Sequence, residues 1–416
     1  MKLLFILDTV DYPASANAQL ARRLADTLVQ QGHTIHLLEL WDGKTPPPNP
    51  PLCTQFQLAF ADERMMNTAL EHGAADGPPL PQRMARLAAH PSAVLAAVRM
   101  IGLKKPRRQC VCRKKLEELD AAHHYDAVIA VAAPYYAAFA LADAAIGGKK
   151  AVWQMDPYTA NCQARQNGGA LQRELHLYEQ VERLFITQPM QADYVSGDFA
   201  PYQGKTQVLE FPSLVPSVPA PSPESDGADA GERPLHCVFA GSLYPGVRSP
   251  EFALELFHGL QLPGVQLVCV GGGWEQFPGL ADRGFALLGE GLVLTGPLPP
   301  EKAHELLARA DVLVNLGNGV ANQVPSKIFE YFGSGKPVLN LAKRADDPSL
   351  AYFERYPLAC TVLEGEGCGP EVCARVRRFL QTCPKQALPF EQVAQLFPQN
   401  TPAAVAKALL HGLGTV

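Results

Sequence analysis

The sequence predicts an α/β protein with two parallel sheets, and two observations carry this prediction. Apolar runs of strand length alternate with amphipathic helices in both halves of the chain, which is the pattern of a parallel sheet covered by helices. Residues 212–234 separate the two halves and are rich in Pro, Ser and Gly without a hydrophobic period. The chain has 416 residues, of which 47% are hydrophobic and 19% are charged, so it can bury two separate cores.

These features predict the domain boundaries. We expect a first Rossmann-like domain over residues 1–211, a Pro-rich linker over 212–234 and a second Rossmann-like domain over 235–395. In sheets of this kind, ligands bind at the carboxyl ends of the strands. Functional residues are therefore sought in the loops that follow the predicted strands.

The first half begins with a buried strand at residues 2–7, an apolar run that ends at Asp8. An amphipathic helix is expected at 16–31, where leucines recur every four residues. The Pro-rich residues 46–51 interrupt the alternation, and the region up to about residue 120 is expected to be irregular or helical. Further strands are expected at 34–40, 127–131, 150–155, 184–187 and 208–211, with helices at 136–145, 173–182 and 190–195.

The alternation restarts after the linker. Strands are expected at 236–240, 265–270, 292–295, 311–316 and 337–341, and helices at 251–260, 300–309 and from 326 onward.

Residues 322–341, which read NQVPSKIFEYFGSGKPVLNL, are the most informative segment of the chain. Pro325 and Ser326 are typical of a helix start, where Ser can cap the free amides. Lys327 in the first turn is unfavourable for the helix dipole alone, but it suits an anion that is held by the same amides. A glycine at position 333 ends the short helix before an apolar strand. The segment therefore predicts a phosphate-binding loop and helix.

This segment resembles the donor-binding loop of retaining GT-B glycosyltransferases with a Glu-x7-Glu signature, the group 1 or family 4-like branch. The resemblance implies the GT-B fold, in which two Rossmann-like domains face each other across a cleft and a C-terminal helix, here within 396–416, crosses back to the first domain. It implies that Glu330, the second Glu, binds the ribose of a nucleotide-sugar. Asn322 stands in place of the first Glu, which contacts the transferred sugar in that branch.

Other positions of the second half extend the resemblance. Gly241 ends a strand in a turn where relatives carry a basic residue next; Ser242 takes that place, and Arg248 is the candidate for a second basic residue. A solvated surface arginine and ordinary tight turns are the alternatives. The predicted donor-binding residues are Gly241, Ser242, Gly272, Thr295, Pro325, Ser326, Lys327 and Glu330, and the predicted catalytic residues are Asn322, Lys327 and Arg248.

The first domain is expected to bind the acceptor, through Ser15, Asn17 and Asp156. The loop from Asp8 to Asn17 contains no glycine, so the dinucleotide-binding fingerprint is absent. Ser15 and Asn17 can instead cap the following helix, and Asp156 precedes a proline, a common way to open a turn.

Residues 99–115 form a basic segment with eight Lys and Arg residues and no acidic residue. Such a segment in an acidic chain can bind anionic lipid headgroups, and a solvated basic loop is the alternative. Binding of RNA is disfavoured because no aromatic residues interleave the charge.

The composition excludes several classes. A formal net charge of −5 argues against general nucleic-acid binding. The apolar run at the start is too short for a signal peptide, and no run of about 18 apolar residues suggests a membrane span. Ten scattered cysteines indicate reduced thiols, and hence a cytoplasmic location with or without peripheral attachment to the inner face of the membrane. Cys110 and Cys112 lack partners at zinc spacing, so no metal site is expected.

The resulting expectation is a metal-independent, retaining glycosyltransferase. It would move a sugar from a nucleotide-diphosphate sugar to a hydroxyl of a glycan or lipid-linked glycan, with no cofactor besides that donor. Two alternatives remain open: a nucleotide-sugar epimerase, and a non-catalytic GT-B protein that binds a nucleotide-sugar or a partner.

Overall fold

The computed structural model describes residues 1–8, 15–41, 52–59, 108–132, 134–159, 169–216, 233–384 and 386–414. The chain forms two compact units. The first contains residues 1–210 together with 402–416, and the second contains residues 211–401. Most of the expected linker, residues 217–232, lies outside the described residues.

The first unit is built on a seven-stranded sheet with the order β3-β2-β1-β4-β5-β6-β7, in which all neighbouring strands run parallel. The strands are β1 (Lys2–Asp8), β2 (Thr34–Trp41), β3 (Thr54–Ala59), β4 (Ala127–Val131), β5 (Lys149–Gln154), β6 (Arg183–Ile186) and β7 (Thr206–Val208). The central strand β4 is buried at every residue, which explains its unbroken apolar sequence.

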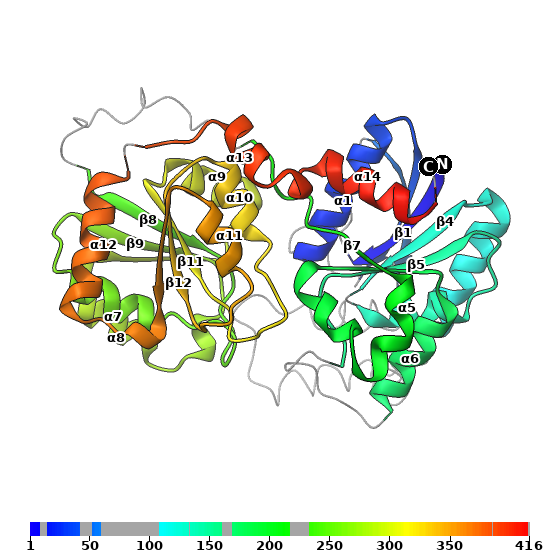
Figure 1. Cartoon of the computed structure of the whole chain (residues 1–416), viewed down its shortest axis with the longest axis horizontal. Helices are drawn as coiled ribbons and strands as arrows, with labels where there is room; N and C mark the ends of the chain where they lie inside the picture. The colour runs from blue at the N-terminus through cyan, green and yellow to red at the C-terminus, as the bar shows by residue number, and fades with distance from the viewer. Residues whose placement is uncertain are drawn as a thin grey trace, which may run out of the picture. The chain divides into compact units, whose positions relative to one another are not determined.

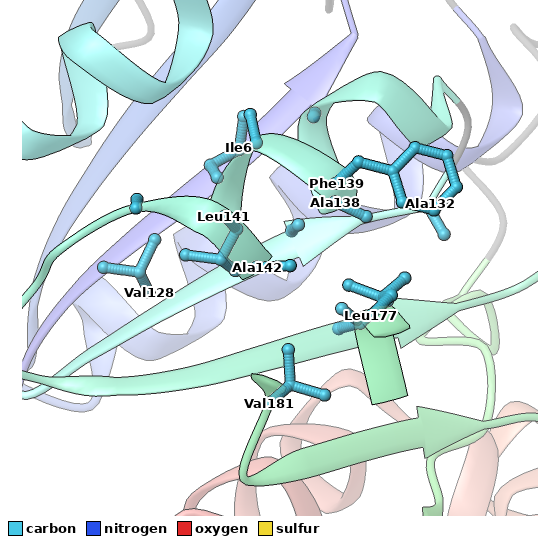
Figure 2. Packing of buried hydrophobic residues seen from close by; sticks show 14 of the residues in the cluster. Ile6, Val128, Ala132, Ala138, Phe139, Leu141, Ala142, Leu177 and Val181 are labelled. Carbon is cyan, nitrogen blue, oxygen red and sulfur yellow. The ribbon is translucent and has the colours of Figure 1, made fainter. Parts of the chain in front are cut away.

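Helices cover both faces of this sheet. They are α1 (Ala16–Gln30), a helical segment at 108–123, α5 (Tyr135–Asp143), α6 (Ala170–Gln180), the 3₁₀ segments η1 (Gln188–Tyr194) and η2 (Gly197–Lys205), and α14 (Pro402–Gly412). Figure 2 shows part of this core: Leu141 and Ala142 of α5 lie toward Val128, Phe139 lies next to Ala132, and Leu177 of α6 belongs to the same cluster. The alternating apolar positions of the sequence thus meet in one core.

The last helix, α14, belongs to the first unit and packs against α1 (Figure 1). Two cations hold its end: Arg183 Nε donates to the carbonyl oxygen of Gly412 at 2.7 Å, and Lys149 Nζ donates to that of Leu413 at 2.6 Å. Positive charge at a helix C-terminus is favourable because the last carbonyl groups carry partial negative charge.

The second unit has a six-stranded sheet with the order β10-β9-β8-β11-β12-β13, again parallel between all neighbours. The strands are β8 (Leu235–Ala240), β9 (Val265–Val270), β10 (Leu292–Gly296), β11 (Val312–Leu316), β12 (Val338–Ala342) and β13 (Ala359–Leu363). The strand order reverses direction between β8 and β11. In open parallel sheets, such a switch point is where ligands bind, beyond the carboxyl ends of the strands.

Figure 1 shows α7 (Glu251–Leu260), α8 (Leu280–Leu288) and α12 (Pro370–Thr382) on one face of this sheet, and α9 (Pro300–Arg309), α10 (Lys327–Gly333) and α11 (Leu350–Arg355) on the other. The remaining elements are η4 (Trp274–Gln276), η5 (Gly289–Gly291), η6 (Glu364–Glu366), α13 (Phe390–Leu396) and η7 (Pro398–Asn400). The right-handed rule for parallel connections places α7 and α8 opposite α9, α10 and α11, because the chain moves along the sheet in opposite directions before and after β10.

Some expectations about the elements were wrong. Residues 54–59 form the edge strand β3, although the region up to residue 120 was expected to be irregular or helical. Pairing with β2 makes this segment a strand, because its own apolar pattern is too short to indicate one. The strand expected at 208–211 lies at 206–208, and the helix expected at 190–195 is the 3₁₀ segment 188–194. The Pro-rich residues 46–51 lie outside the described residues.

His36 gives the first unit a pH-dependent stability. Its side chain is 7% exposed, and its Nδ1 lies 2.8 Å from the Tyr125 hydroxyl. Burial, together with His123 and Lys2 nearby, lowers the pKa of His36 to about 4 from its ordinary 6.5. As the pH falls below 6.5, this histidine is therefore protonated in the unfolded chain, while in the folded chain it stays neutral until about pH 4. The unfolding free energy therefore decreases as the pH falls through this range.

We expect the unfolding free energy of the protein to drop by about 2 kcal/mol more than that of a His36→Gln variant between pH 7 and pH 4, since one pKa unit is worth about 1.4 kcal/mol and solvent screens part of the shift. Urea unfolding across this pH range measures the difference. His124→Gln, which changes an exposed neighbour, should follow the parent. Equal pH dependence in parent and His36→Gln would contradict the assignment.

Candidate functional site

The turns after β8 and β9 are joined by hydrogen bonds at the carboxyl edge of the second sheet. Gly241 N donates to Val270 O at 2.9 Å, and Leu243 N donates to Gly272 O at 3.0 Å. Gly271 has φ +135°, and a Cβ there would lie 2.0 Å from the Gly241 carbonyl oxygen. Only glycine allows this approach. The predicted residues Gly241 and Gly272 therefore belong to one close-packed pair of turns.

The turn after β10 is bonded to the turn after β9, so the three turns after β8, β9 and β10 form one row. Gly271 N donates to Gly296 O at 3.0 Å, and the Thr295 hydroxyl donates to the same carbonyl at 2.9 Å. Thr295 thus lies beside the glycine turn of β9, half-buried. Its contact with a nucleotide base stays a prediction.

A tight hairpin carries Arg248 back over the end of β8. Arg248 N donates to Tyr244 O at 2.8 Å, and Tyr244 N donates to Arg248 O at 2.9 Å. Pro245 occupies the second turn position and Gly246, with φ +78°, the third, which are the residue types of a type II turn. This Tyr-Pro-Gly turn is a local signal that the sequence interpretation did not use.

Arg248 is a half-buried cation with incomplete hydrogen bonding. Its Nη2 donates to Asn318 Oδ1 at 2.7 Å, and its Nη1 lies 3.5 Å from Ser242 O. Its Nε is enclosed and has no hydrogen-bond partner among the described residues. Burial lowers the pKa of Arg248, while electrostatic interactions with Tyr331, Tyr244 and Asp347 act in the opposite direction. A guanidinium in this state is suited to binding an anion.

A buried carboxylate, Asp347, lies in the charge environment of Arg248 and was not predicted. Its side chain is 3% exposed, and its Oδ1 accepts from Ser349 N at 2.8 Å and from the Ser349 hydroxyl at 2.7 Å. Burial raises the pKa of Asp347, and the bonds from Ser349 together with Arg248 lower it. No local pattern could reveal it, because Asp347 follows β12 and Arg248 follows β8.

The start of α10 differs from the prediction at Ser326. The serine has helical backbone angles, φ −59° and ψ −25°, and its hydroxyl makes no capping hydrogen bond. The predicted cap is therefore wrong, because a capping side chain needs an extended backbone to reach back to the free amides. Its carbonyl oxygen instead accepts from the Ser213 hydroxyl at 3.2 Å. Pro325 is buried beside it.

Lys327 and Glu330 form an ion pair on α10, with Lys327 Nζ 3.5 Å from Glu330 Oε2. Their side chains are 41% and 23% exposed, so both remain accessible. The next residue, Tyr331, ties the helix to the end of β8, since Ala240 N donates to its hydroxyl at 3.0 Å. Asn322 lies half-buried in the loop between β11 and α10.

The structure thus brings the predicted donor residues to one edge of the second sheet. The turns after β8, β9 and β10 supply Gly241, Ser242, Arg248, Gly272 and Thr295, and the β11–α10 connection supplies Asn322, Pro325, Ser326, Lys327 and Glu330.

The predicted acceptor residues lie at the carboxyl edge of the first sheet. Asn17 Nδ2 donates to Asp156 Oδ2 at 2.9 Å and lies 3.4 Å from the Ala132 carbonyl oxygen. Burial raises the pKa of Asp156, and the bond from Asn17 opposes this. Ser15 caps α1, with Ala18 N donating to its hydroxyl at 3.1 Å. The structure therefore pairs Asn17 with Asp156 and gives Ser15 a capping bond.

A buried polar network supports this edge and was missed from the sequence. Gln154 is 1% exposed; its Nε2 donates to the Tyr135 hydroxyl at 3.0 Å, and its Oε1 accepts from the Tyr194 hydroxyl at 2.8 Å. Tyr135 in turn donates to the backbone carbonyl of Asp156. Such a satisfied network holds its members in one arrangement. Its residues come from separate elements, so sequence spacing does not reveal it.

The basic segment is described only from residue 108 onward, where it is helical, and residues 99–107 lie outside the described residues. Two of its cations pair with acidic residues one turn further on: Lys115 with Glu118 at 2.7 Å, and Arg113 with Glu117 at 3.9 Å. These pairs reduce the charge that this part offers to a surface.

The described part of the chain contains no group of three or more His, Cys, Asp or Glu side chains placed to hold a metal ion. None of its helices combines the length and apolar character that crossing a membrane requires.

Comparison with known proteins gives a fold. No known family profile matches the chain, and no curated protein sequence is similar to it. Solved structures match it over its whole length. The E. coli trehalose-6-phosphate structure bound with UDP-2-fluoro glucose has a TM-score of 0.65 at 10% identity, covering 100% of this chain and 99% of that one. Sucrose-phosphate synthase from Thermosynechococcus elongatus has a TM-score of 0.61 at 15% identity, covering 99% and 98%.

Anabaena HepE in complex with UDP is a third such structure, with a TM-score of 0.59, 13% identity and complete coverage, 100%, of both chains. The two parallel sheets with their helices and these matches establish the GT-B fold for this chain, as expected from residues 322–341.

Proposed function

We propose that the protein is a glycosyltransferase that moves a sugar from a nucleotide-diphosphate sugar to a hydroxyl acceptor. The observation that carries this proposal is Arg248, a half-buried guanidinium at the switch point of the second sheet whose one short hydrogen bond among the described residues goes to Asn318. Ligands of parallel sheets bind at such a point, and guanidinium groups recognise phosphate. The GT-B fold, seen in structures bound with UDP and a UDP-sugar, supports the same assignment.

The donor would lie along the row of turns. Arg248 and Lys327 contact the diphosphate, Glu330 binds the ribose, and the base lies near Gly272 and Thr295. As the glycosidic bond breaks, negative charge grows on the diphosphate oxygens, and preorganised cations stabilise it. In this proposal those two side chains supply the positive charge, so the reaction needs no metal ion.

The acceptor would bind at the carboxyl edge of the first sheet, where Asp156 and Asn17 can accept from and donate to a sugar hydroxyl. We propose that the leaving diphosphate takes the proton of the attacking hydroxyl, which gives retention at the anomeric carbon. Asn322 would orient the transferred sugar by hydrogen bonds rather than by charge.

A non-catalytic protein that binds a nucleotide-sugar is the second candidate. Asn322 and Ser242 favour it, because both replace residues that the resembled family uses on the donor. Analysis of the products formed from UDP- and GDP-sugars separates the candidates: transfer or donor hydrolysis indicates an enzyme, while binding without any product indicates the second.

Nucleotide binding provides the direct test. We expect UDP or GDP at 100 times its dissociation constant to raise the unfolding free energy by about 2.7 kcal/mol, seen as a higher melting temperature. Lys327→Ala and Glu330→Ala should each weaken binding about tenfold, since one charged contact is lost. Lys302→Ala is a matched control, because Lys302 forms an exposed pair with Glu305 at the same spacing on α9. If no nucleoside diphosphate stabilises the protein, the proposed function is wrong.

A further inference from the structure

We infer that Asn318 holds Arg248 in place and also donates a hydrogen bond to the diphosphate of the donor. The inference rests on the proposed function and adds a residue to its binding site. Asn318 lies two residues beyond the end of β11, on the other side of the switch point from the hairpin that carries Arg248. The role of the basic residue whose place Ser242 takes would thereby pass in part to an amide.

The geometry fixes which way the Asn318 amide faces. An arginine side chain has only donors, so the atom 2.7 Å from Nη2 has to be the carbonyl oxygen of the Asn318 side chain. The amide nitrogen then points away from Nη2. This nitrogen makes no hydrogen bond to any described residue, and protein atoms do not enclose it.

The backbone around Asn318 is held firmly, which favours a binding role over a mobile loop. Gly319 N donates to Val247 O at 2.7 Å, so the loop after β11 is bonded directly to the hairpin of Arg248. Asn318 itself is only 5% exposed. Its amide nitrogen is nevertheless not enclosed, so its two N–H groups can donate to a ligand or to water. Beside the Arg248 guanidinium, an anionic oxygen is the acceptor that suits this amide donor best.

The test compares nucleotides that differ only in the diphosphate. Titration calorimetry measures UDP and uridine, or GDP and guanosine if the parent prefers that base, on the full-length protein. Asn318→Ala should weaken binding of the diphosphate by about 10- to 100-fold, because it removes a charge-assisted bond and loosens Arg248. Binding of the nucleoside should stay within about twofold. A purely structural defect would weaken both.

A double-mutant cycle separates donation from positioning. In the Arg248→Ala background, Asn318→Ala should weaken UDP binding by a further factor of about 5, since the direct bond is still lost. No further loss would overturn the direct contact, and unchanged UDP binding by Asn318→Ala alone would overturn the whole inference. If Asn318→Ala does not fold, Asn318→Asp, of the same shape, supplies the measurement: it keeps the acceptor for Arg248 but lacks the N–H donor, and binding as in the parent would equally overturn the inference.

Failure of the inference is distinguishable from failure of the proposed function. A parent protein that binds no nucleoside diphosphate overturns the function, and with it the inference. A parent that binds UDP or GDP, together with Asn318 variants that bind it equally well, overturns only the role of Asn318.

Discussion

Arg248→Ala is expected to weaken UDP or GDP binding about a hundredfold, equivalent to roughly 2.7 kcal/mol, and to lower any transfer rate by about 10²- to 10³-fold. The reason is the environment of the guanidinium, which is half-buried and, among the residues that the structure describes, donates to Asn318 and weakly to the Ser242 carbonyl. Because the group is shielded from solvent, its charge acts more strongly on a ligand than that of an exposed arginine would. Titration calorimetry with the nucleoside diphosphate and the nucleoside measures the effect.

The controls separate charge from shape. Arg248→Lys keeps the charge but loses the planar fork, so we expect an intermediate loss of about tenfold. Arg283→Ala removes an exposed arginine that pairs with Glu255 at 2.7 Å on the helical face, and it should leave binding unchanged. Melting temperatures of all variants show whether the fold survives. Equal nucleotide affinity in the parent and Arg248→Ala would refute the placement of the diphosphate.

Phe332→Ala is expected to lower the unfolding free energy by about 3–5 kcal/mol, the usual cost of removing a fully buried aromatic ring. Phe332 is 0% exposed and lies between two rings, stacked on Tyr356 at 4.4 Å and on Phe397 at 4.9 Å between centroids. Tyr356 and Phe397 directly follow α11 and α13, so the rings join α10 to the ends of these helices, and the loss should fall on the unit that carries the donor residues.

Calorimetric melting measures this effect, and unfolding of the two units can give separate transitions. We expect only the transition of the second unit to shift after Phe332→Ala, along with weaker nucleotide binding, because α10 also carries Lys327 and Glu330. Phe285→Ala on α8 is the matched control, since its ring is 47% exposed and its loss should cost less than about 1 kcal/mol. A destabilisation of similar size in both variants would contradict the proposed role of the aromatic cluster.

Several elements could be predicted to the residue from the sequence. The helices at 251–260 and 300–309 and the strand at 265–270 have the predicted bounds in the structure. Each of them has a clear apolar periodicity and a residue that marks its end, such as Pro250 before the first helix or the three glycines after the strand. Helix α8, the strand β13 and helix α12 were not predicted, although they complete the sheet and its cover.

The errors fall where local preference and tertiary contact disagree. Ser326 was expected to cap a helix, a common role for serine, but the chain enters α10 already in helical geometry and the hydroxyl is not in position to cap. Strand β3 forms because it pairs with the edge of β2, and the sequence of residues 54–59 alone does not indicate this pairing. Prediction from local sequence preferences cannot detect either effect, because both depend on contacts with distant parts of the chain.

The sequence by itself determined the two α/β units, the order of most of their elements and the loops in which ligand contacts were to be sought. These follow from the period of apolar residues and from glycine and proline, which act over a few residues. Only the tertiary structure decided that Arg248 binds Asn318 and interacts electrostatically with Asp347, that Asn17 binds Asp156, and that Tyr135 links Gln154 to the Asp156 backbone. Those contacts join segments far apart in the chain, and folding brings them together because each sheet aligns the carboxyl ends of its strands.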